Sequence, residues 1–361
     1  MTRSPDPVKL LIVIYHRFEL WRAPEWFAER VQREFPNVDV VRLDDYKAIE
    51  RELPDTDVLM SWSSTAEQLA SAKKLRWIHS PAAAVHRLMI PELAKSDVVV
   101  TSARGVHGPV VAEHVIALVL ALAKRLPSAV RYQLQRKWGQ ELLWSERPRP
   151  REIAGAMLGL VGLGSIGMEV ARLASALGMR VIGVRETKIT TEDTEGHRGK
   201  TKAPSTRGKS NRSLGMTQPQ WVSHTYGPDE IDVMLGQADY VVLAAPVTPR
   251  TRGLINAKRL AAMKRDAYLI NVGRAPLIDE PALVTALREG SIAGAALDVF
   301  EPEPLAEGSP FWEMENVLIT PHSAALTERL WERHFELLGN NLRRFMAGAP
   351  LLGTVDKARG Y

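Results

Sequence analysis

The sequence contains no cysteine, which excludes disulfide bonds, thiolate nucleophiles and cysteine-ligated metal sites. It also contains no apolar run long enough to cross a bilayer, and residues 1–7 show no hydrophobic signal region. These absences predict a cytoplasmic protein that has no membrane partner. We also expect no bound metal ion.

The charge balance is weakly basic, because the 361 residues carry a formal net charge of +5 at pH 7. A basic balance attracts nucleic acid, but much of this excess falls within residues 186–226. We therefore predict no nucleic-acid partner. Binding of nucleic acid through residues 186–226 is a third hypothesis, after the two given below. The length exceeds that of most single domains, so two domains are expected.

Three glycines near the middle of the chain have the spacing G-x-G-x-x-G and follow a short apolar run. Gly162 permits a tight turn, Gly164 leaves room for a pyrophosphate against the backbone, and Gly167 lets the following helix pack on the strand. The helix N-terminus offers free N–H groups and a positive dipole end to phosphate. Since a second strand follows at residues 180–184, the pattern predicts a dinucleotide-binding site.

Short strands alternate with helices along the chain, an order typical of parallel α/β domains. We predict two doubly wound parallel-sheet domains: a Rossmann-type nucleotide-binding domain around the glycine motif and a flavodoxin-like substrate domain before it. The expected strands are residues 8–15, 38–41, 57–60, 76–79, 98–100, 156–161, 180–184, 240–244, 267–271, 292–297 and 317–320. The expected helices are residues 24–35, 65–72, 109–126, 168–177, 231–235, 256–263, 280–289 and 326–346.

The final helix is expected to return to the first unit. The substrate domain is therefore predicted to span residues 1–102, completed by 324–361, and the nucleotide-binding domain to span residues 103–323. The apolar helix at residues 109–126 contains Glu113 and His114. A paired carboxylate and imidazole can be catalytic, but the apolar surroundings favour a structural role in a core or subunit-contact helix.

Residues 186–226 interrupt the alternation of strands and helices. A strand-to-helix connection normally takes a few residues, whereas this one takes roughly forty. The segment is rich in Thr, Ser, Gly, Lys and Arg and nearly free of apolar residues before Trp221. It is interpreted as a flexible surface insertion. The alternative is that its basic side chains contact the adenosine phosphate end of a cofactor.

Polar residues interrupt apolar sequence just beyond three predicted strands: Arg274 after the first, Asp298 to Glu303 after the second, and His322 after the third. Ligands of a doubly wound sheet bind outside the carboxyl ends of its strands, so these residues should converge with the glycine turn. Arginine binds a carboxylate as a fork, and a histidine beside a carboxylate exchanges protons near neutral pH. The three positions together predict a functional site.

The motifs LGLVGLGSIG, VAEH, NVGRAPLID, AALDVFEPEPL and TPHSA resemble those of the D-isomer-specific 2-hydroxyacid dehydrogenases. The resemblance covers nearly the whole chain except residues 186–226 and is weakest over residues 1–70. It implies hydride transfer between NAD(P)H and a small 2-oxo or D-2-hydroxy acid, such as glyoxylate, hydroxypyruvate or another 2-ketoacid. It also implies a homodimer packed through residues 109–126.

The same resemblance assigns roles to individual residues. It makes His322 the general acid/base, Glu303 its paired carboxylate and Arg274 the binder of the substrate carboxylate and carbonyl, while Asp298 meets the nicotinamide carboxamide. The implied cofactor-binding residues are Gly162, Gly164, Ser165, Ile166, Gly167, Arg185, Pro246, Thr251, Val272, Gly273, Arg274, Asp298 and His322.

Two positions depart from the family pattern. Arg185 stands near where an acidic residue would bind the ribose hydroxyls, and arginine pairs instead with a 2′-phosphate, which favours NADP. The neighbouring Glu186 keeps NAD open.

The family's loop that binds the substrate carboxylate usually reads Ala-Gly-Val-Asp, whereas in this chain it reads AAVH. The resemblance implies that Ala84 and Val85 bind the substrate, together with Arg274 and His322. If position 84 needs a positive φ, alanine there costs energy. His86 either adds positive charge near an acidic substrate or caps the next helix.

A second functional hypothesis comes from another class. Some relatives of this family use the nucleotide fold as a sensor or corepressor with little turnover. Retention of Arg274, Glu303 and His322 argues against a dead site, although sensors can keep such residues.

Overall fold

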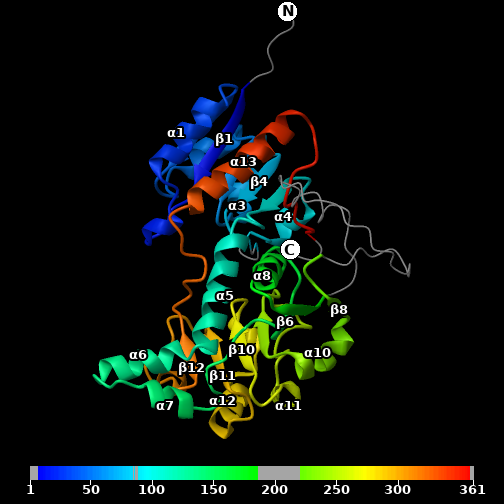
Figure 1. The fold of residues 1–361 in the computed structure, drawn as a ribbon. Helices are drawn as coiled ribbons and strands as arrows, with labels where there is room; N and C mark the ends of the chain where they lie inside the picture. Colours follow the sequence, from blue (N-terminus) through cyan, green and yellow to red (C-terminus); the bar gives the residue numbers. More distant parts are fainter. Residues whose placement is uncertain (1–6, 84, 86–87, 186–219, 358–361) are drawn as a thin grey trace, which may run out of the picture. The chain divides into compact units, whose positions relative to one another are not determined.

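The computed structural model describes residues 7–83, 85, 88–185 and 220–357. It divides into two compact units, the first formed by residues 1–107 and 326–361 and the second by residues 108–325 (Figure 1). The boundaries lie a few residues after the predicted ones. The role of the first unit in substrate binding stays a prediction.

The first unit contains a five-stranded parallel sheet in the order β2-β1-β3-β4-β5. This is the flavodoxin-like strand order, as predicted. Its strands are β1 Val8–Val13, β2 Val38–Leu43, β3 Val58–Ser61, β4 Trp77–Ser80 and β5 Val99–Ser102. Its α-helices are α1 Glu25–Glu34, α2 Ile49–Glu52, α3 Ala66–Ser71, α4 Pro91–Lys95 and α13 Leu330–Met346.

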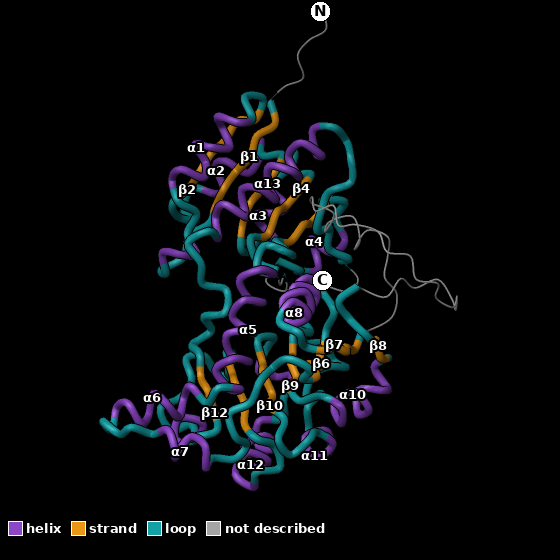
Figure 2. The backbone as a smooth tube through the Cα atoms, viewed as in Figure 1, coloured by secondary structure: helices purple, strands orange, loops and turns teal. Residues whose placement is uncertain are grey.

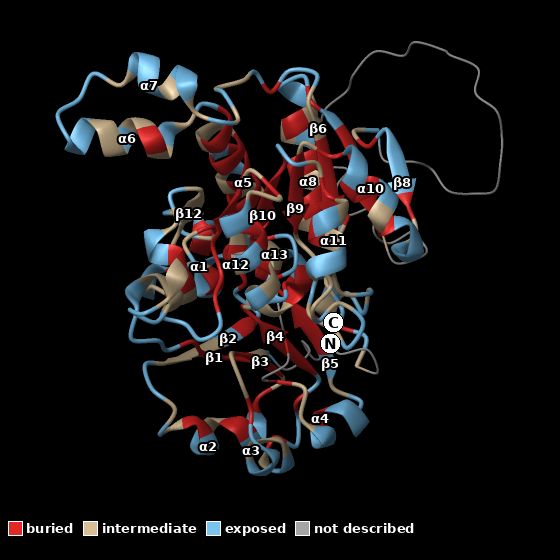
Figure 3. Ribbon diagram, turned by 90° about the horizontal axis from the view of Figure 1, so that it is seen from below, coloured by how far each residue is buried: buried red, intermediate tan, exposed pale blue. Residues whose placement is uncertain are grey.

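Both faces of this sheet are covered, which explains why its strands read as continuous apolar runs. α1 and α13 pack on the face that presents Leu10, Ile12 and Trp77. The opposite face, which presents Leu11 and Ile78, packs against α2, α3 and α4. The central strands of both units are buried and the outer faces of the helices are exposed (Figure 3).

The second unit contains a seven-stranded parallel sheet in the order β12-β11-β10-β9-β6-β7-β8 (Figure 2). The strand order reverses between β6 and β9, which is the point where doubly wound sheets bind ligands. The strands are β6 Met157–Val161, β7 Arg180–Val184, β8 His224–Tyr226, β9 Tyr240–Leu243, β10 Tyr268–Asn271, β11 Gly294–Leu297 and β12 Val317–Ile319. The α-helices are α5 Gly108–Ala123, α6 Leu126–Leu134, α7 Gln140–Ser145, α8 Ser165–Ala176, α10 Ile231–Gln237, α11 Ala257–Ala262 and α12 Glu280–Glu289.

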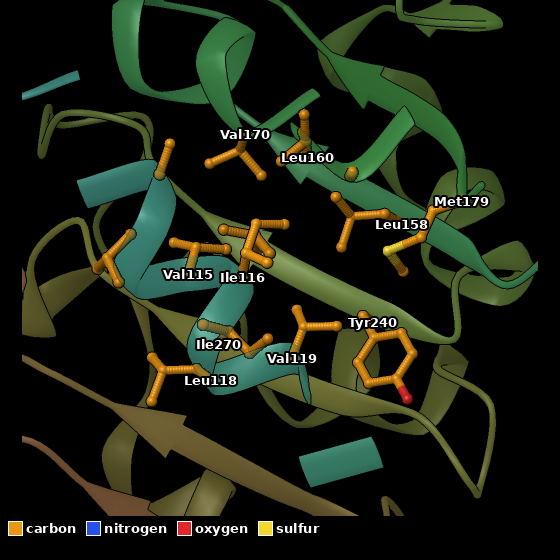
Figure 4. Packing of buried hydrophobic residues seen from close by; sticks show 14 of the residues in the cluster. Val115, Ile116, Leu118, Val119, Leu158, Leu160, Val170, Met179, Tyr240 and Ile270 are labelled. Atoms are coloured by element: carbon orange, nitrogen blue, oxygen red, sulfur yellow. The ribbon is translucent and has the colours of Figure 1, made fainter. Parts of the chain in front are cut away.

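α5 is a core helix of this unit, as its apolar sequence predicted. Val115 and Val119 belong to one buried cluster with Leu158 and Ile270 of the sheet and Val170 of α8 (Figure 4). α10, α11 and α12 cover the other face of the sheet. Both faces of the seven-stranded sheet are therefore covered by helices, and its open positions lie at the strand ends.

One boundary of the predicted insertion is wrong. Residues 186–219 lie outside the described part of the chain, but β8 falls within the range predicted as an insertion and pairs in parallel with β7. In β8 only Tyr226 is buried, so this edge strand lacks the apolar run that marks the others. No helix among the described residues has the length and apolar character needed to cross a membrane.

Candidate active site

The second unit carries its predicted site residues along one edge of the sheet. The strand ends there are paired in a single row across the sheet: Val184, Val161, Leu243, Asn271, Leu297 and Ile319. The glycine motif, Arg185, Pro246, Arg274, Asp298 and His322 each follow one of these ends within a few residues. The structure thus brings sequence-distant residues to the carboxyl edge, where such sheets bind ligands.

The glycine loop after β6 fits the pyrophosphate of a dinucleotide. Gly162 has φ +102°, and a Cβ there would come within 2.9 Å of the Ala244 backbone. A Cβ at Gly167 would overlap the Gly162 carbonyl oxygen. At Gly164, by contrast, a Cβ would meet no atom within 4 Å. The chain itself therefore requires the outer two glycines, whereas the space over Gly164 is open for a ligand.

α8 begins directly after this loop, and its N-cap residue, Gly164, has no side chain with which to cap the first turn. The backbone N–H groups of the first helical residues, including Ser165 and Ile166, have no partner within an α-helix. Together with the helix dipole they suit a phosphate. The residues present therefore fit the dinucleotide that the motif predicted.

The loop after β10 presents Arg274. Asn271 is 1% exposed; its Nδ2 donates to the Arg274 carbonyl oxygen at 3.0 Å, and its Oδ1 accepts from the Gly273 N–H at 3.0 Å. The amide therefore closes the turn over buried Val272 and leaves the Arg274 side chain exposed at the edge. Sequence reasoning missed Asn271; the available signal was an amide at the end of a buried strand, just before Val-Gly.

Two other predicted cofactor-binding positions shape the same edge. After β9, the Thr251 hydroxyl donates to the Pro246 carbonyl oxygen at 2.7 Å and accepts from the Thr248 N–H at 2.7 Å, which closes that loop. After β7, the backbone N–H of Arg185 donates to the Tyr226 carbonyl oxygen at 3.2 Å. Both positions follow strand ends on the row that carries the glycine turn.

His322 and Glu303 form a hydrogen-bonded pair at this edge. His322 Nδ1 lies 2.7 Å from Glu303 Oε2, and Glu303 Oε1 accepts from the Phe300 N–H at 3.0 Å. Both oxygens of the carboxylate are thus hydrogen-bonded, and Oε2 accepts from the ring of His322 when its Nδ1 carries the proton. The His322 side chain is 46% exposed, so the other ring nitrogen, Nε2, is the one available to a substrate.

Asp298 holds the segment that carries His322 through several hydrogen bonds. Its side chain is 1% exposed; Oδ1 accepts from the Thr320 hydroxyl at 2.6 Å and the Ser323 N–H at 2.9 Å, and Oδ2 accepts from the Ala324 N–H at 3.1 Å. Its backbone oxygen accepts from the His322 N–H at 2.9 Å. The described contacts of Asp298 are therefore with the chain itself; its predicted contact with a nicotinamide stays a prediction.

The predicted substrate loop belongs to the first unit. Val85 is 2% exposed and its side chain is part of the core against α4. Only its backbone can therefore meet a substrate. Ala84 and His86 lie outside the described residues, and the predictions made for them stay open.

Comparison with known proteins identifies what the chain resembles. Residues 116–206 and 214–324 match the family model described as "D-isomer specific 2-hydroxyacid dehydrogenase, NAD binding domain". The chain is 33% identical over 306 residues to a glyoxylate reductase of Korarchaeum cryptofilum, an alignment that covers 84% of this chain and 83% of that protein.

Two solved structures are similar over nearly their whole length. One is a D-isomer specific 2-hydroxyacid dehydrogenase from Xanthobacter autotrophicus Py2 in complex with NADPH and MES, with a TM-score of 0.77 and 30% identity over 99% of this chain and 100% of that one. The other is an NADPH-dependent glyoxylate/hydroxypyruvate reductase from Sinorhizobium meliloti in complex with NADP and sulfate, with a TM-score of 0.74 and 28% identity over 98% and 100%. The resemblance inferred from the motifs is confirmed.

Proposed function

Because the chain belongs to the D-isomer specific 2-hydroxyacid dehydrogenase family, we propose that it transfers a hydride between NAD(P)H and a small 2-oxo or D-2-hydroxy acid. The observation that carries this proposal is the His322–Glu303 pair, 2.7 Å apart, on the sheet edge that also holds the Gly162 turn and Arg274. A proton donor, a carboxylate binder and a phosphate-binding turn share one edge.

In the reducing direction each of these side chains has one task. Protonated His322 gives the proton on Nε2 to the forming alkoxide oxygen, and Glu303 stabilises the charged ring through Nδ1. The Arg274 guanidinium binds the substrate carboxylate as a fork and polarises the carbonyl. When bound along the glycine turn, the nicotinamide nucleotide supplies the hydride that C2 of the acid receives.

We propose NADP as the preferred cofactor. Arg185 follows the second strand of the nucleotide-binding sheet, where a guanidinium pairs with a 2′-phosphate and where it offers no acceptor to a ribose hydroxyl. The two solved relatives were crystallised with NADPH and with NADP. Arg185→Ala should lower kcat/KM with NADPH by about tenfold, the loss of one charge-assisted contact, and change it little with NADH.

Arg180→Ala is the matched control, since Arg180 begins the same strand at its opposite end. It should change neither value. A clear preference of the unmodified protein for NADH would overturn the NADP proposal and leave the reaction class intact.

We propose glyoxylate, hydroxypyruvate and short 2-ketoacids as substrates. Two of the relatives are named as a glyoxylate reductase and a glyoxylate/hydroxypyruvate reductase, and Arg274 requires only a carboxylate beside a carbonyl. The test is a panel of these acids and pyruvate, each assayed with NADPH and with NADH. In the reverse direction, D-lactate and D-glycerate should be oxidised and their L-isomers should not. No oxidation of either nucleotide with any acid would favour a sensor or corepressor role.

We propose a homodimer whose contact lies on α6, α7 and the segment between them. The resemblance implies a contact through residues 109–126, but ten residues of α5 are buried inside the second unit itself and are not available to a partner. By contrast, Leu134, Trp138 and Trp144 are 79%, 92% and 57% exposed. Large apolar side chains that are exposed close together in the sequence, as on residues 134–144, are typical of a protein–protein contact. Sedimentation should give a dimer, and Trp138→Glu with Leu134→Glu should give a monomer.

A further inference from the structure

His114 contacts the loop that carries the catalytic histidine. It lies on α5, with its side chain 19% exposed, and its Nε2 is 3.2 Å from Thr320 Oγ1 and 3.6 Å from Asp298 Oδ1. Its neighbour Glu113 is exposed, so the carboxylate and imidazole of this sequence pair have different surroundings. The His114 ring instead contacts Thr320, two residues before His322, and Asp298, whose backbone oxygen accepts the His322 N–H.

The direction of the hydrogen bonds in this group is determined by the number of protons. The Thr320 hydroxyl has one hydrogen, and its oxygen lies 2.6 Å from Asp298 Oδ1. An ionised carboxylate only accepts, so the hydroxyl donates to Asp298 and can only accept from His114. His114 must then carry its proton on Nε2. Burial lowers the pKa of His114, against an opposing effect of Asp298, so the ring is neutral at pH 7.

The chain of donors ends on backbone that is held in an unfavourable conformation. His322 has φ +50°, in the left-handed region that side chains other than glycine seldom adopt. Such a conformation persists where its surroundings determine it. Here Asp298 accepts hydrogen bonds from the His322 backbone, from Thr320 before it, and from residues 323 and 324 after it.

We propose that His114 is a positioning residue of the active site, which acts through Thr320 and Asp298 on the backbone of His322. By donating Nε2–H to the Thr320 hydroxyl, it keeps that hydroxyl directed at the Asp298 carboxylate. Asp298 then holds both sides of His322, so that the ring meets Glu303 through Nδ1 and presents Nε2. The kinetic consequence rests on the proposed function, whereas the hydrogen-bond chain does not.

The kinetic test compares two substitutions at one position. The amide nitrogen of His114→Gln reaches the place of Nε2 and donates without a titrating ring, whereas His114→Leu removes the donor. We expect His114→Leu to lower kcat with a 2-oxo acid on the order of tenfold, the factor worth one hydrogen bond, with the KM for the nucleotide unchanged. His114→Gln should recover most of that loss. Glu113→Gln, the exposed neighbour, should behave as the unmodified protein.

A double substitution tests the path. Thr320→Val keeps the shape of the side chain but removes the hydroxyl, so it should lower kcat about as far as His114→Leu. The two changes together should cost no more than either alone, because each breaks the same chain. Losses that multiply would overturn the path through Thr320, and so would a kcat for His114→Gln as low as that for His114→Leu.

A measurement without substrate or nucleotide reads the chain directly. In protein labelled with ¹⁵N at its histidines, His114 should be the Nε2–H tautomer at pH 7. The ring resonances of His322 should move in His114→Leu and Thr320→Val and stay in place in His114→Gln. An Nδ1–H tautomer at His114, or unmoved His322 resonances, would overturn the proposal. If the unmodified protein reduced no 2-oxo acid, the proposed function would fail while these spectra still decided the positioning role.

Discussion

The Nδ1 atom of His322 lies 2.7 Å from Oε2 of Glu303, and the other oxygen of that carboxylate accepts the Phe300 N–H at 3.0 Å. A carboxylate held at both oxygens fixes the ring plane as well as the tautomer. The Nε2 atom is therefore aimed before any substrate arrives. We propose that this preorganisation lets a side chain that is 46% exposed serve as the general acid.

Replacing the proposed proton donor should remove most turnover and leave nucleotide binding in place. His322→Ala removes the Nε2 proton, and general acid catalysis contributes about 10²–10⁴-fold, so kcat should fall by that order. The glycine turn, which is the proposed binding site of the nucleotide, follows another strand end and should be unaffected. Steady-state assays with a 2-oxo acid measure kcat, and a fluorescence titration with NADPH measures nucleotide binding. Near-normal turnover in this variant would refute the assigned role.

Replacing the paired carboxylate should have a smaller effect. Glu303→Gln keeps a side chain of the same shape beside His322 and removes its negative charge, which stabilises the protonated ring. We expect kcat to fall about tenfold to a hundredfold, less than for His322→Ala. Glu301→Gln is the control, because Glu301 is exposed two residues earlier and His322 bonds to Glu303. Equal losses in the two variants would contradict a specific pairing.

The glycine motif offers a prediction that separates folding from binding. A Cβ at Gly164 meets no atom within 4 Å, whereas a Cβ at Gly167 overlaps the Gly162 carbonyl oxygen. Gly164→Ala should therefore keep the melting temperature and raise the KM for the nucleotide about tenfold. Gly167→Ala should lower the melting temperature by several degrees even without ligand. A fall in melting temperature for Gly164→Ala would show that the chain itself needs that glycine.

The strands of both sheets were predictable because parallel strands buried on both faces read as apolar runs. β8 was not, since only Tyr226 of its three residues is buried. α2 and α4 are too short to show a helical period, with four and five residues. α6 and α7 were not predicted either; several of their large apolar residues, such as Leu134, are exposed, so burial in a core does not determine their apolar pattern.

The site residues divide in the same way. Arg274 and His322 interrupt apolar sequence just beyond strand ends, so local pattern and family motifs both pointed to them. The contact of His114 with Thr320 joins positions 206 residues apart, and no local pattern reports such a bond. Asn271 was predicted only as the last residue of a strand. Its side chain closes the turn before Arg274 through two hydrogen bonds that exist only in the folded loop.

The first unit should lose stability in acid through a buried histidine. His79 on β4 is fully buried, its Nδ1 lies 2.8 Å from Thr101 Oγ1, and its Nε2 has no hydrogen-bond partner among the described residues. Burial lowers the pKa of His79 to about 4, and burial also lowers the pKa of His334, with smaller electrostatic effects of His107 and His79. An unfolded histidine has a pKa of about 6.5.

Well above pH 6.5 the imidazole of His79 is neutral in both the folded and the unfolded chain, so it adds no pH dependence to stability. Between pH 6.5 and about 4 the unfolded chain binds a proton on this histidine that the folded chain does not. The free energy of unfolding therefore decreases as the pH is lowered, by up to about 1.4 kcal/mol per pH unit. His79→Asn keeps a polar group near Nδ1 and removes the titration. It should lower the melting temperature at pH 8, since it leaves space in the core, and yet flatten its decline between pH 6.5 and 4. His16→Asn, at an exposed histidine, should leave the slope unchanged, and an unaltered slope in His79→Asn would contradict the assignment.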